Sequence, residues 1–232
     1  MRAFTAARIA LGRTGAAQPL RAVLPFRLAH AHARDAVYSS LDKTLLSDQP
    51  WPKQWLHSQA IHREEYLQRP DKGRQLDDRS AEALAPADAD MAIVLVDGLS
   101  ATAINQHAVP LLEILLPLLQ VRQFRVAPVQ VVEQGRVAIG DAIGALLQVQ
   151  LSVVLIGERP GLSSPDSLGA YLTWQPRPGL TDEARNCISN IRPQGLPYQL
   201  AAEKIGYLAA EARRLQATGI GLKDNYTIQL PE

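Results

Sequence analysis

The stretch L-S-V-V-L-I-G-E-R-P-G-L, residues Leu151–Leu162, decides the fold of this chain. Its first seven residues include five aliphatic side chains and end at Gly157. Such a short and almost uninterrupted apolar run is typical of a strand buried on both faces, as in a parallel sheet. Pro160 forces Arg159 into an extended conformation, so no helix can begin directly after the strand. We therefore expect Glu158 and Arg159 to lie at the carboxyl edge of a central strand, where open α/β sheets bind ligands, unless the two simply pair with each other or with neighbours in a surface loop.

A second strand upstream has the same character. Met91–Val96 is apolar throughout, and Asp97-Gly98 turns the chain toward a helix that begins at Ala101 with Ser100 as its N-cap. A strand, a glycine turn and a capped helix together open a βαβ unit, which places Asp97 at the same edge of the sheet as Glu158. This pattern predicts an α/β fold with a doubly wound, mostly parallel sheet and helices on both faces.

The remaining segments continue the alternation of strands and helices. Further strands are expected at Phe124–Val132, with an edge position or a bulge at Pro128, and at Leu168–Trp174. Further helices are expected in four places: a second helical piece at Val109–Gln120 starting near Pro110, then Val137–Gln148, a helix start at Thr181-Asp182-Glu183, and Leu196–Gln216.

The amino-terminal region differs from this pattern. Apolar spacing predicts a helix over Met1–Leu11 and an amphipathic helix over Gln18–Leu41, kinked near Pro25. Residues 1–34 contain six arginines and no acid, whereas the rest of the chain has 18 basic and 23 acidic residues. A basic arm on a mildly acidic body suits docking onto an acidic partner surface, and that docking should weaken with salt. The polar linker at 85–90 divides a helical region, 1–85, from the α/β domain, 86–232.

Two stretches of this region carry alternatives. Asp48–Trp55 reads as a turn-rich connector whose two tryptophans anchor the arm to the body. The turn Gln68–Leu76 gathers Arg69, Lys72 and Arg74, which either hold a phosphate or a partner's carboxylate, or form an ordinary charged loop.

The sequence lacks the motifs that are typical of several function classes. One cysteine permits neither an internal disulfide nor a multi-cysteine zinc site, and no apolar run approaches the 18 residues of a membrane span. No phosphate-binding glycine motif, nucleophile elbow or zinc-protease motif is present, and there is no basic stripe with aromatics for nucleic acid. His30 and His32 face different sides of a helix and make a poor metal pair. The residues alone indicate a ligand-binding module, with no catalytic or metal-binding residue to assign.

Four segments nevertheless resemble a known family. V-D-G-L-S-A-T-A-I (Val96–Ile104), G-R-V-A-I (Gly135–Ile139), L-I-G-E-R-P-G-L (Leu155–Leu162) and N-C-I-S-N-I-R (Asn186–Arg192) are similar to segments of the small, or light, subunit of ethanolamine ammonia-lyase, in the same order. F-T-A-A-R-I-A-L-G-R-T-G and R-P-D-K-G-R-Q-L resemble its amino-terminal half. The resemblance covers nearly the whole chain.

The resemblance implies a function. Enzymes of that family convert ethanolamine to acetaldehyde and ammonia with adenosylcobalamin, and the large subunit carries the substrate and the radical chemistry. The small subunit, a Rossmann-like domain after a helical amino-terminal region that docks on the large subunit, would complete the cobalamin site within a higher-order hetero-oligomer. Cobalt would keep its own benzimidazole ligand, the base-on form. Neither nucleic acid nor a membrane is expected as a partner.

The resemblance also implies which residues touch the cofactor: Val137 in G-R-V-A-I, Glu158 in G-E-R-P-G and Cys187 in C-I-S-N-I. The position of Glu158 agrees with the strand argument, whereas Cys187 would otherwise be interpreted as a buried structural thiol. Some relatives carry an amino-terminal leader for a bacterial microcompartment, which this chain is expected to lack, so either the microcompartment or the cytoplasm fits. The alternative function is an α/β regulatory module that binds a nucleotide-like ligand and has no catalytic role.

Overall fold

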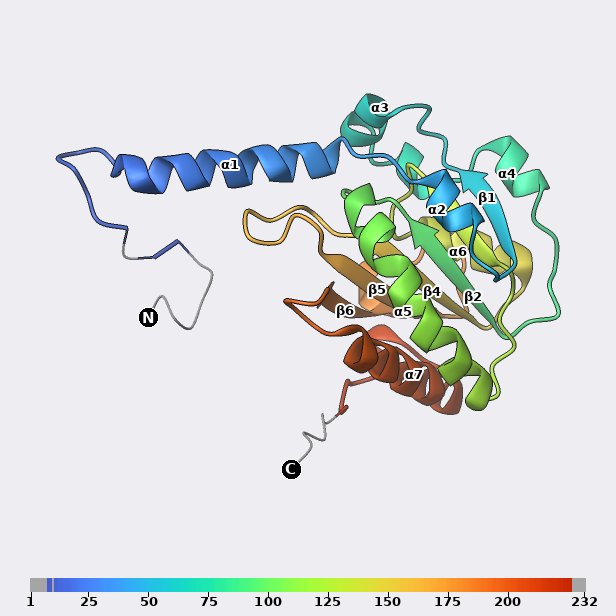
Figure 1. The fold of residues 1–232 in the computed structure, drawn as a ribbon. Helices are drawn as coiled ribbons and strands as arrows, with labels where there is room; N and C mark the ends of the chain where they lie inside the picture. The colour runs from blue at the N-terminus through green and yellow to red at the C-terminus, as the bar shows by residue number, and fades with distance from the viewer. Residues whose placement is uncertain (1–7, 10, 227–232) are drawn as a thin grey trace.

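The computed structural model describes residues 8–9 and 11–226 and contains a six-stranded sheet with helices around it (Figure 1). The strands are β1 (Lys53–His57), β2 (Met91–Val96), β3 (Val129–Glu133), β4 (Leu151–Gly157), β5 (Leu168–Trp174) and β6 (Arg185–Ile191). The helices are α1 (Leu20–Val37), α2 (Lys43–Ser47), α3 (Arg63–Gln68), α4 (Asp78–Glu82), α5 (Ala101–Val121), α6 (Ile139–Leu147) and α7 (Tyr198–Leu215), with short 3-10 turns η2 (Lys72–Arg74), η3 (Asp182–Ala184) and η4 (Gly219–Gly221).

The strand β4 lies in the middle of the sheet. All seven residues of β4 are buried, and the strand runs parallel to β2 with Ile93 opposite Val153. The order across the sheet is β1-β3-β2-β4-β5-β6. The first four of these strands are parallel, whereas β5 and β6 are antiparallel to their neighbours. The expected mostly parallel α/β class is confirmed, with an antiparallel part that a fully parallel doubly wound sheet would not have.

Helices cover both faces of the sheet, as expected. α5 and α7 pack on one face, over Ile93 and Val153, while α6 packs on the other, over Val94 and Val154. Alternating residues of the central strands therefore enter two separate cores.

The long helix α5 passes one test for a membrane span. Among the described residues it is the one helix that is long and apolar enough to cross a bilayer by length and composition. This is weak evidence, because core helices pass the same test. Nine residues of α5 are buried against the sheet and α7.

Four sequence expectations were wrong in detail. α5 runs without interruption through Pro110 and Pro117, so no second helical piece begins there. β3 begins only after Pro128, and it is an internal strand between β1 and β2. A proline that begins a strand removes no hydrogen bond from the ladder, so it needs neither an edge nor a bulge. Thr181-Asp182-Glu183 leads only into the single turn η3, and the following segment with Cys187 is strand β6.

The fourth difference lies in the amino-terminal region. Residues 53–57, expected in a connector, form β1 and pair in parallel with β3, with Trp55 opposite Val131. Trp51 and Trp55 are partly buried against the main core, which confirms their role as anchors. The segment before residue 86 is therefore not helical throughout. The division at 85–90 stays a prediction, although residues 84–90 contain neither helix nor strand.

α1 stands away from the body of the molecule (Figure 1). Its only buried residue is Ala36, near its carboxyl end, and Pro25 lies inside the helix. The expected helix over Gln18–Leu41 is thus confirmed with slightly narrower bounds. Most of the other expected helix, Met1–Leu11, lies outside the described residues.

The carboxyl ends of β2, β3 and β4, here called the rim, are tied together by Asp97. Its buried carboxylate accepts hydrogen bonds from the backbone N–H groups of Gln134 (2.9 Å) and Gly135 (3.1 Å), in the turn after β3. Gln134 has a φ of 56°, so the two N–H groups converge on one anion as in a backbone nest. Asp97 thus serves as an internal clamp, and its carboxylate is not a free group on the rim.

Two further contacts complete the clamp. The guanidinium of Arg63 lies 3.8 Å from the Asp97 carboxylate and donates to the carbonyls of Gly98 (2.8 Å) and Val37 (2.6 Å), which links the end of α1 to the rim. The backbone at the ends of β2 and β4 meets closely: a Cβ on Gly157 would lie 2.0 Å from the carbonyl oxygen of Ser100. Ser100 occupies the expected N-cap position, but its hydroxyl donates to the carbonyl of Pro165 (2.9 Å), with no side-chain capping bond.

Asp97 should make stability depend on pH. Desolvation raises the pKa of Asp97 to about 6, against an ordinary value of 3.8. Between these values the native state holds a proton that the unfolded chain has released. The free energy of unfolding, relative to that of Asp97→Asn, should therefore fall as pH rises through this window, by at most about 3 kcal/mol.

Urea unfolding of both proteins at a series of pH values measures this difference. The two stability curves should converge or cross between the two pKa values and run parallel above the higher one. Curves that stay parallel through the whole window would show that the Asp97 carboxylate is not desolvated.

Candidate functional site

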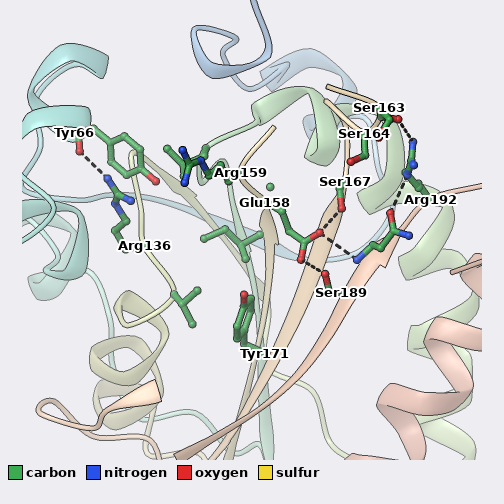
Figure 2. Close-up of a pocket in the computed structure, with 15 residues that line it drawn as sticks. Tyr66, Arg136, Glu158, Arg159, Ser163, Ser164, Ser167, Tyr171, Ser189 and Arg192 are labelled. Atoms are coloured by element: carbon green, nitrogen blue, oxygen red, sulfur yellow. Dashed lines mark hydrogen bonds between the residues drawn. The ribbon is translucent and has the colours of Figure 1, made fainter. Parts of the chain in front are cut away.

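A cavity of about 700 Å³ opens on the rim, between α3, the turn after β3, the end of β4 and the β5–β6 strands (Figure 2). Its size lies within the range of about 300–1,000 Å³ that is usual for ligand sites. The residues that line it are Tyr66, Leu99, Arg136, Val137, Ile156, Gly157, Glu158, Arg159, Ser163, Ser164, Ser167, Tyr171, Ser189, Asn190 and Arg192.

One wall of the cavity is built around Glu158. Its carboxylate accepts hydrogen bonds from the hydroxyl of Ser189 (2.6 Å), the backbone N–H of Asn190 (3.1 Å) and the hydroxyl of Ser167. A Cβ on Gly169 would lie 3.0 Å from Glu158 Oε1, so glycine leaves the space that the carboxylate occupies. Glu158 is therefore held by Ser189 and Asn190 of β6 and by Ser167, which directly precedes β5, and it forms no ion pair with Arg159. A role of Glu158 in ligand binding stays a prediction.

The opposite side of the cavity carries positive charge. Arg136 and Arg159 both line it, and neither forms a salt bridge with a carboxylate in the described part of the chain. Arg192 is different: its guanidinium lies 3.4 Å from the Asp166 carboxylate and also donates to Asn190 Oδ1 (3.0 Å). Two guanidiniums in the lining are thus left without a negative partner.

Tyr66 stands beside these arginines. Its ring is fully buried, and the guanidinium carbons of Arg63 and Arg136 lie 4.6 Å and 4.2 Å from the ring centroid. Its hydroxyl is buried without a hydrogen-bond partner. Desolvation raises the pKa of Tyr66, so the phenol stays protonated and able to donate. Figure 2 shows the ring on α3 with its hydroxyl directed toward the cavity.

Two of the three residues expected to contact a cofactor line this cavity: Val137, at the start of α6, and Glu158. Cys187 does not line it. The cysteine lies on β6 opposite Tyr171, and the Tyr171 hydroxyl, which is part of the lining, hydrogen-bonds to its sulfur. The structure therefore brings all three to one region, with Cys187 behind Tyr171. Cofactor contact by these residues stays a prediction.

The Cys187 thiol has low reactivity. Although the residue as a whole is exposed, its sulfur packs against Tyr171, and this desolvation, together with the negative charge of Glu158, raises the pKa of the thiol. The hydrogen bond from Tyr171 lowers the pKa of the thiol, but by less than desolvation raises it. The thiol is therefore a poor nucleophile at neutral pH.

Sequence reasoning missed much of this site. Ser189 and Asn190 lie two and three residues after Cys187 in N-C-I-S-N, but only the antiparallel pairing of β5 with β6 brings them to Glu158. Tyr66 carries no motif, and the Gln68–Leu76 turn beside it was the nearest signal. In that turn Arg69 and Lys72 are neutralised by Asp71 and Glu65, so for these two residues the interpretation as a charged loop is confirmed.

No metal centre is found in the described residues, where no group of three or more histidine, cysteine, aspartate or glutamate side chains could hold an ion. His107 is buried on α5 and contacts the hydroxyl of Tyr198 (2.8 Å) and the carboxylate of Asp166 (3.4 Å). The cavity thus offers a hydrogen-bond-accepting wall and a cationic wall, which suit a large polar ligand. No histidine is among the described residues that line it.

Comparison with known proteins adds a family. The family model for the ethanolamine ammonia-lyase light chain matches residues 1–223. The ethanolamine ammonia-lyase small subunit of Pseudomonas fluorescens (strain Pf0-1) is 52% identical over 242 aligned residues, which cover all of this chain and 88% of the relative. The small subunits of Pseudomonas aeruginosa (strain UCBPP-PA14) and Ralstonia nicotianae (strain ATCC BAA-1114 / GMI1000) are 51% and 50% identical, again over the whole chain and over 89% and 90% of the relatives.

The arrangement of Glu158 and Cys187 can be tested by thiol chemistry. Glu158→Gln removes a charge that raises the pKa of Cys187, so more of the thiol should be ionised and alkylation by iodoacetamide at pH 8 should be faster. The rate of mass increase measures this. Glu183→Gln, which removes an exposed acid four residues away, is the control and should leave the rate unchanged. An unchanged alkylation rate in Glu158→Gln would show that the Glu158 charge does not act on the Cys187 thiol.

Proposed function

This chain belongs to the ethanolamine ammonia-lyase light-chain family, and we propose that, as the small subunit, it completes the adenosylcobalamin site of that enzyme by holding one edge of the corrinoid in the rim cavity. The family membership makes it part of a lyase. Its relatives' name, small subunit, implies a complex with a large subunit. Substrate binding and the conversion of ethanolamine to acetaldehyde and ammonia belong, in this proposal, to the large subunit.

The observation that carries the proposal is the Glu158 wall. The corrin ring has a fringe of carboxamide side chains, whose N–H groups are good donors to a carboxylate. Glu158 is held by Ser167, Ser189 and Asn190 but remains part of the cavity lining, so it can accept a further bond without rearrangement. Val137 adds apolar surface to the same cavity for the ring edge or the benzimidazole. The donor set therefore fits a corrinoid.

Cobalt, in this proposal, keeps its own benzimidazole. The described cavity lining contains no histidine, and His107 is engaged by Tyr198 and Asp166. Bound adenosylcobalamin supplies a cobalt–carbon bond that breaks homolytically, and the protein's part is to orient the cofactor and exclude water. The cavity is smaller than a whole corrinoid, so a second chain must cover the remainder, which supports a site shared between subunits.

The projecting helix α1 is the surface proposed to dock on the large subunit. Leu20, Leu24 and Leu28 lie four residues apart on one face and are 70%, 58% and 59% exposed. Three exposed leucines in a row on a projecting helix form an unpartnered apolar stripe. The exposed Arg21, Arg27 and Arg34 on the same helix favour a partner surface that carries acidic groups.

Reconstitution tests the proposal. We expect ethanolamine deamination and bound cobalamin only when this chain and the large subunit are combined, because neither surface alone encloses the corrinoid. Activity assays and the visible absorbance of co-purified cobalamin measure both properties. Deamination by this chain alone would contradict the proposal. A stable complex without cobalamin would favour the alternative, a regulatory α/β module that binds a nucleotide-like ligand.

The docking surface has its own test. Leu24→Glu should weaken association with the large subunit about tenfold or more, since burial of a leucine side chain contributes roughly 1.5–3 kcal/mol. Glutamate is a strong helix former, so the helix itself should persist. Ile220→Glu, at an 85% exposed position on η4, is the matched control and should leave the affinity unchanged.

Sedimentation or titration calorimetry measures these affinities at two ionic strengths, and the wild-type complex should weaken with added salt. Equal effects of the two glutamate variants would show that α1 is not the docking surface.

A further inference from the structure

The cavity contains a donor that has no partner in the described part of the chain. The hydroxyl of Tyr66 is fully buried, has no hydrogen-bond partner and points toward the cavity (Figure 2). Buried polar groups in native proteins are almost always paired, and an exception calls for an explanation such as a missing ligand. Because burial keeps the phenol protonated, the hydroxyl can donate to an acceptor atom of this ligand.

The neighbouring charges specify what kind of acceptor. Arg136 and Arg159 lie on the same side of the cavity as Tyr66 and lack carboxylate partners in the described chain, and the Nε of Arg136 is also buried without a partner. Guanidinium groups are donors only, and a protonated phenol offers an O–H donor. Three such groups together fit an anion with several acceptor oxygens, the geometry for which arginine is most often used.

Arg136 is held in place before any ligand arrives. Its backbone N–H donates to the carbonyl of Gly73 (2.7 Å), and its Nη2 donates to the carbonyl of Tyr66 (3.1 Å). The guanidinium also stacks on the Tyr66 ring, 4.2 Å from the centroid. A Cβ on Gly73 would lie 2.8 Å from the Arg136 side chain, so glycine permits this close packing. Tyr66 and Arg136 therefore form one preorganised unit.

A cobalamin carries one group of the required chemistry. Its carboxamides are neutral donors and acceptors, whereas the phosphodiester of its nucleotide tail has a negative charge and two free oxygens. On the opposite wall, Glu158 would repel that anion. The two walls would therefore contact different parts of the ligand. The amides would lie on the Glu158 side and the anion on the arginine side.

We propose that Tyr66, Arg136 and Arg159 bind the phosphodiester of the corrinoid's nucleotide tail. This inference rests on the proposed function and assigns a second role within the same cavity. Tyr66 and Arg136 provide fixed donors, and Arg159, exposed at the end of β4, adds its charge at the mouth of the cavity.

The experiment compares two corrinoids on the complex with the large subunit. Hydroxocobalamin has the nucleotide tail, whereas cobinamide lacks it and its phosphodiester. Tyr66→Phe should weaken cobalamin binding about tenfold or more, as expected for the loss of a hydrogen bond to a charged group, and should change cobinamide binding less than twofold. Spectrophotometric titration gives both dissociation constants without any turnover.

A second measurement, the Tm of the free chain, should not fall when cobalamin binding weakens. Because the hydroxyl is buried and unpaired, Tyr66→Phe should leave unchanged or raise the Tm of the free chain. A variant that lowers both the Tm and the binding of both corrinoids would show a structural role for the hydroxyl and overturn the proposal.

Two control variants distinguish the contribution of the Glu158 side of the cavity from that of the arginine side. Tyr171→Phe deletes the same group from a tyrosine on the Glu158 side, and Glu158→Gln removes the carboxylate. Both should affect cobalamin and cobinamide to the same extent, because both ligands carry the amides. If Tyr66→Phe affects the two corrinoids equally, or if the wild-type complex binds both equally well, the phosphodiester assignment is wrong while the proposed function stands. If the wild-type complex binds neither corrinoid, the proposed function itself is wrong and this inference with it.

Discussion

The carboxylate of Asp97 holds the rim together, and the rest of the site depends on it. It lies at the end of β2 and accepts the backbone N–H groups of the turn after β3, which is the turn that presents Arg136 and Val137. Arg63, on α3, approaches the same carboxylate and joins it to the carbonyls of Gly98 and Val37. One buried anion thereby fixes the start of α6, the start of α5 and the end of the projecting helix α1. Burying a charge is unfavourable unless it is hydrogen-bonded and paired, and these contacts provide part of that compensation, although desolvation still raises the pKa of Asp97.

This clamp explains how a cavity can keep polar groups unsatisfied. The Tyr66 hydroxyl and the Nε of Arg136 have no partners, although both lie in or beside well-packed structure. Such groups lower the stability of the free chain, and they persist only where surrounding contacts determine their positions. Tyr66 belongs to α3, whose first residue is Arg63, so the helix that presents the unpaired hydroxyl is anchored by the clamp itself. Preorganised donors of this kind need little rearrangement when a ligand binds.

The antiparallel part of the sheet has a separate role. β5 runs back along β4, which places Ser167 beside Glu158, and β6 then adds Ser189 and Asn190 from the next strand. A fully parallel sheet would place the start of the next strand at the far edge and could not supply donors here. The hairpin-like arrangement fixes the carboxylate wall, whereas the clamp fixes the cationic wall. The carboxylate wall therefore depends on the antiparallel strands, and the cationic wall depends on the Asp97 clamp.

Local sequence determined the elements that a short-range pattern can specify. β2, β4, β5 and α7 follow directly from unbroken or periodic apolar runs, and the turn residues Gly157 and Pro160 set the place of Glu158 at a strand end. The V-D-G-L-S, G-R-V-A-I, G-E-R-P-G and N-C-I-S-N segments were enough to indicate the family. Where short-range signals compete with packing they failed: α5 continues through Pro110, and the segment after Thr181 became a strand because β5 offers it an open edge.

Tertiary structure alone decided which of these residues meet. Tyr66 and Arg136 are 70 positions apart and Glu158 and Ser189 are 31 apart, and no periodicity links either pair. Only strand order, the direction of β5 and β6 and the buried Asp97 bring them to one cavity. The sequence by itself therefore determined strands β2, β4 and β5 and the family, because these depend on side chains close together along the chain. The two walls of the site were decided by the fold, because their charged and donor groups lie far apart in sequence and meet only in the folded chain.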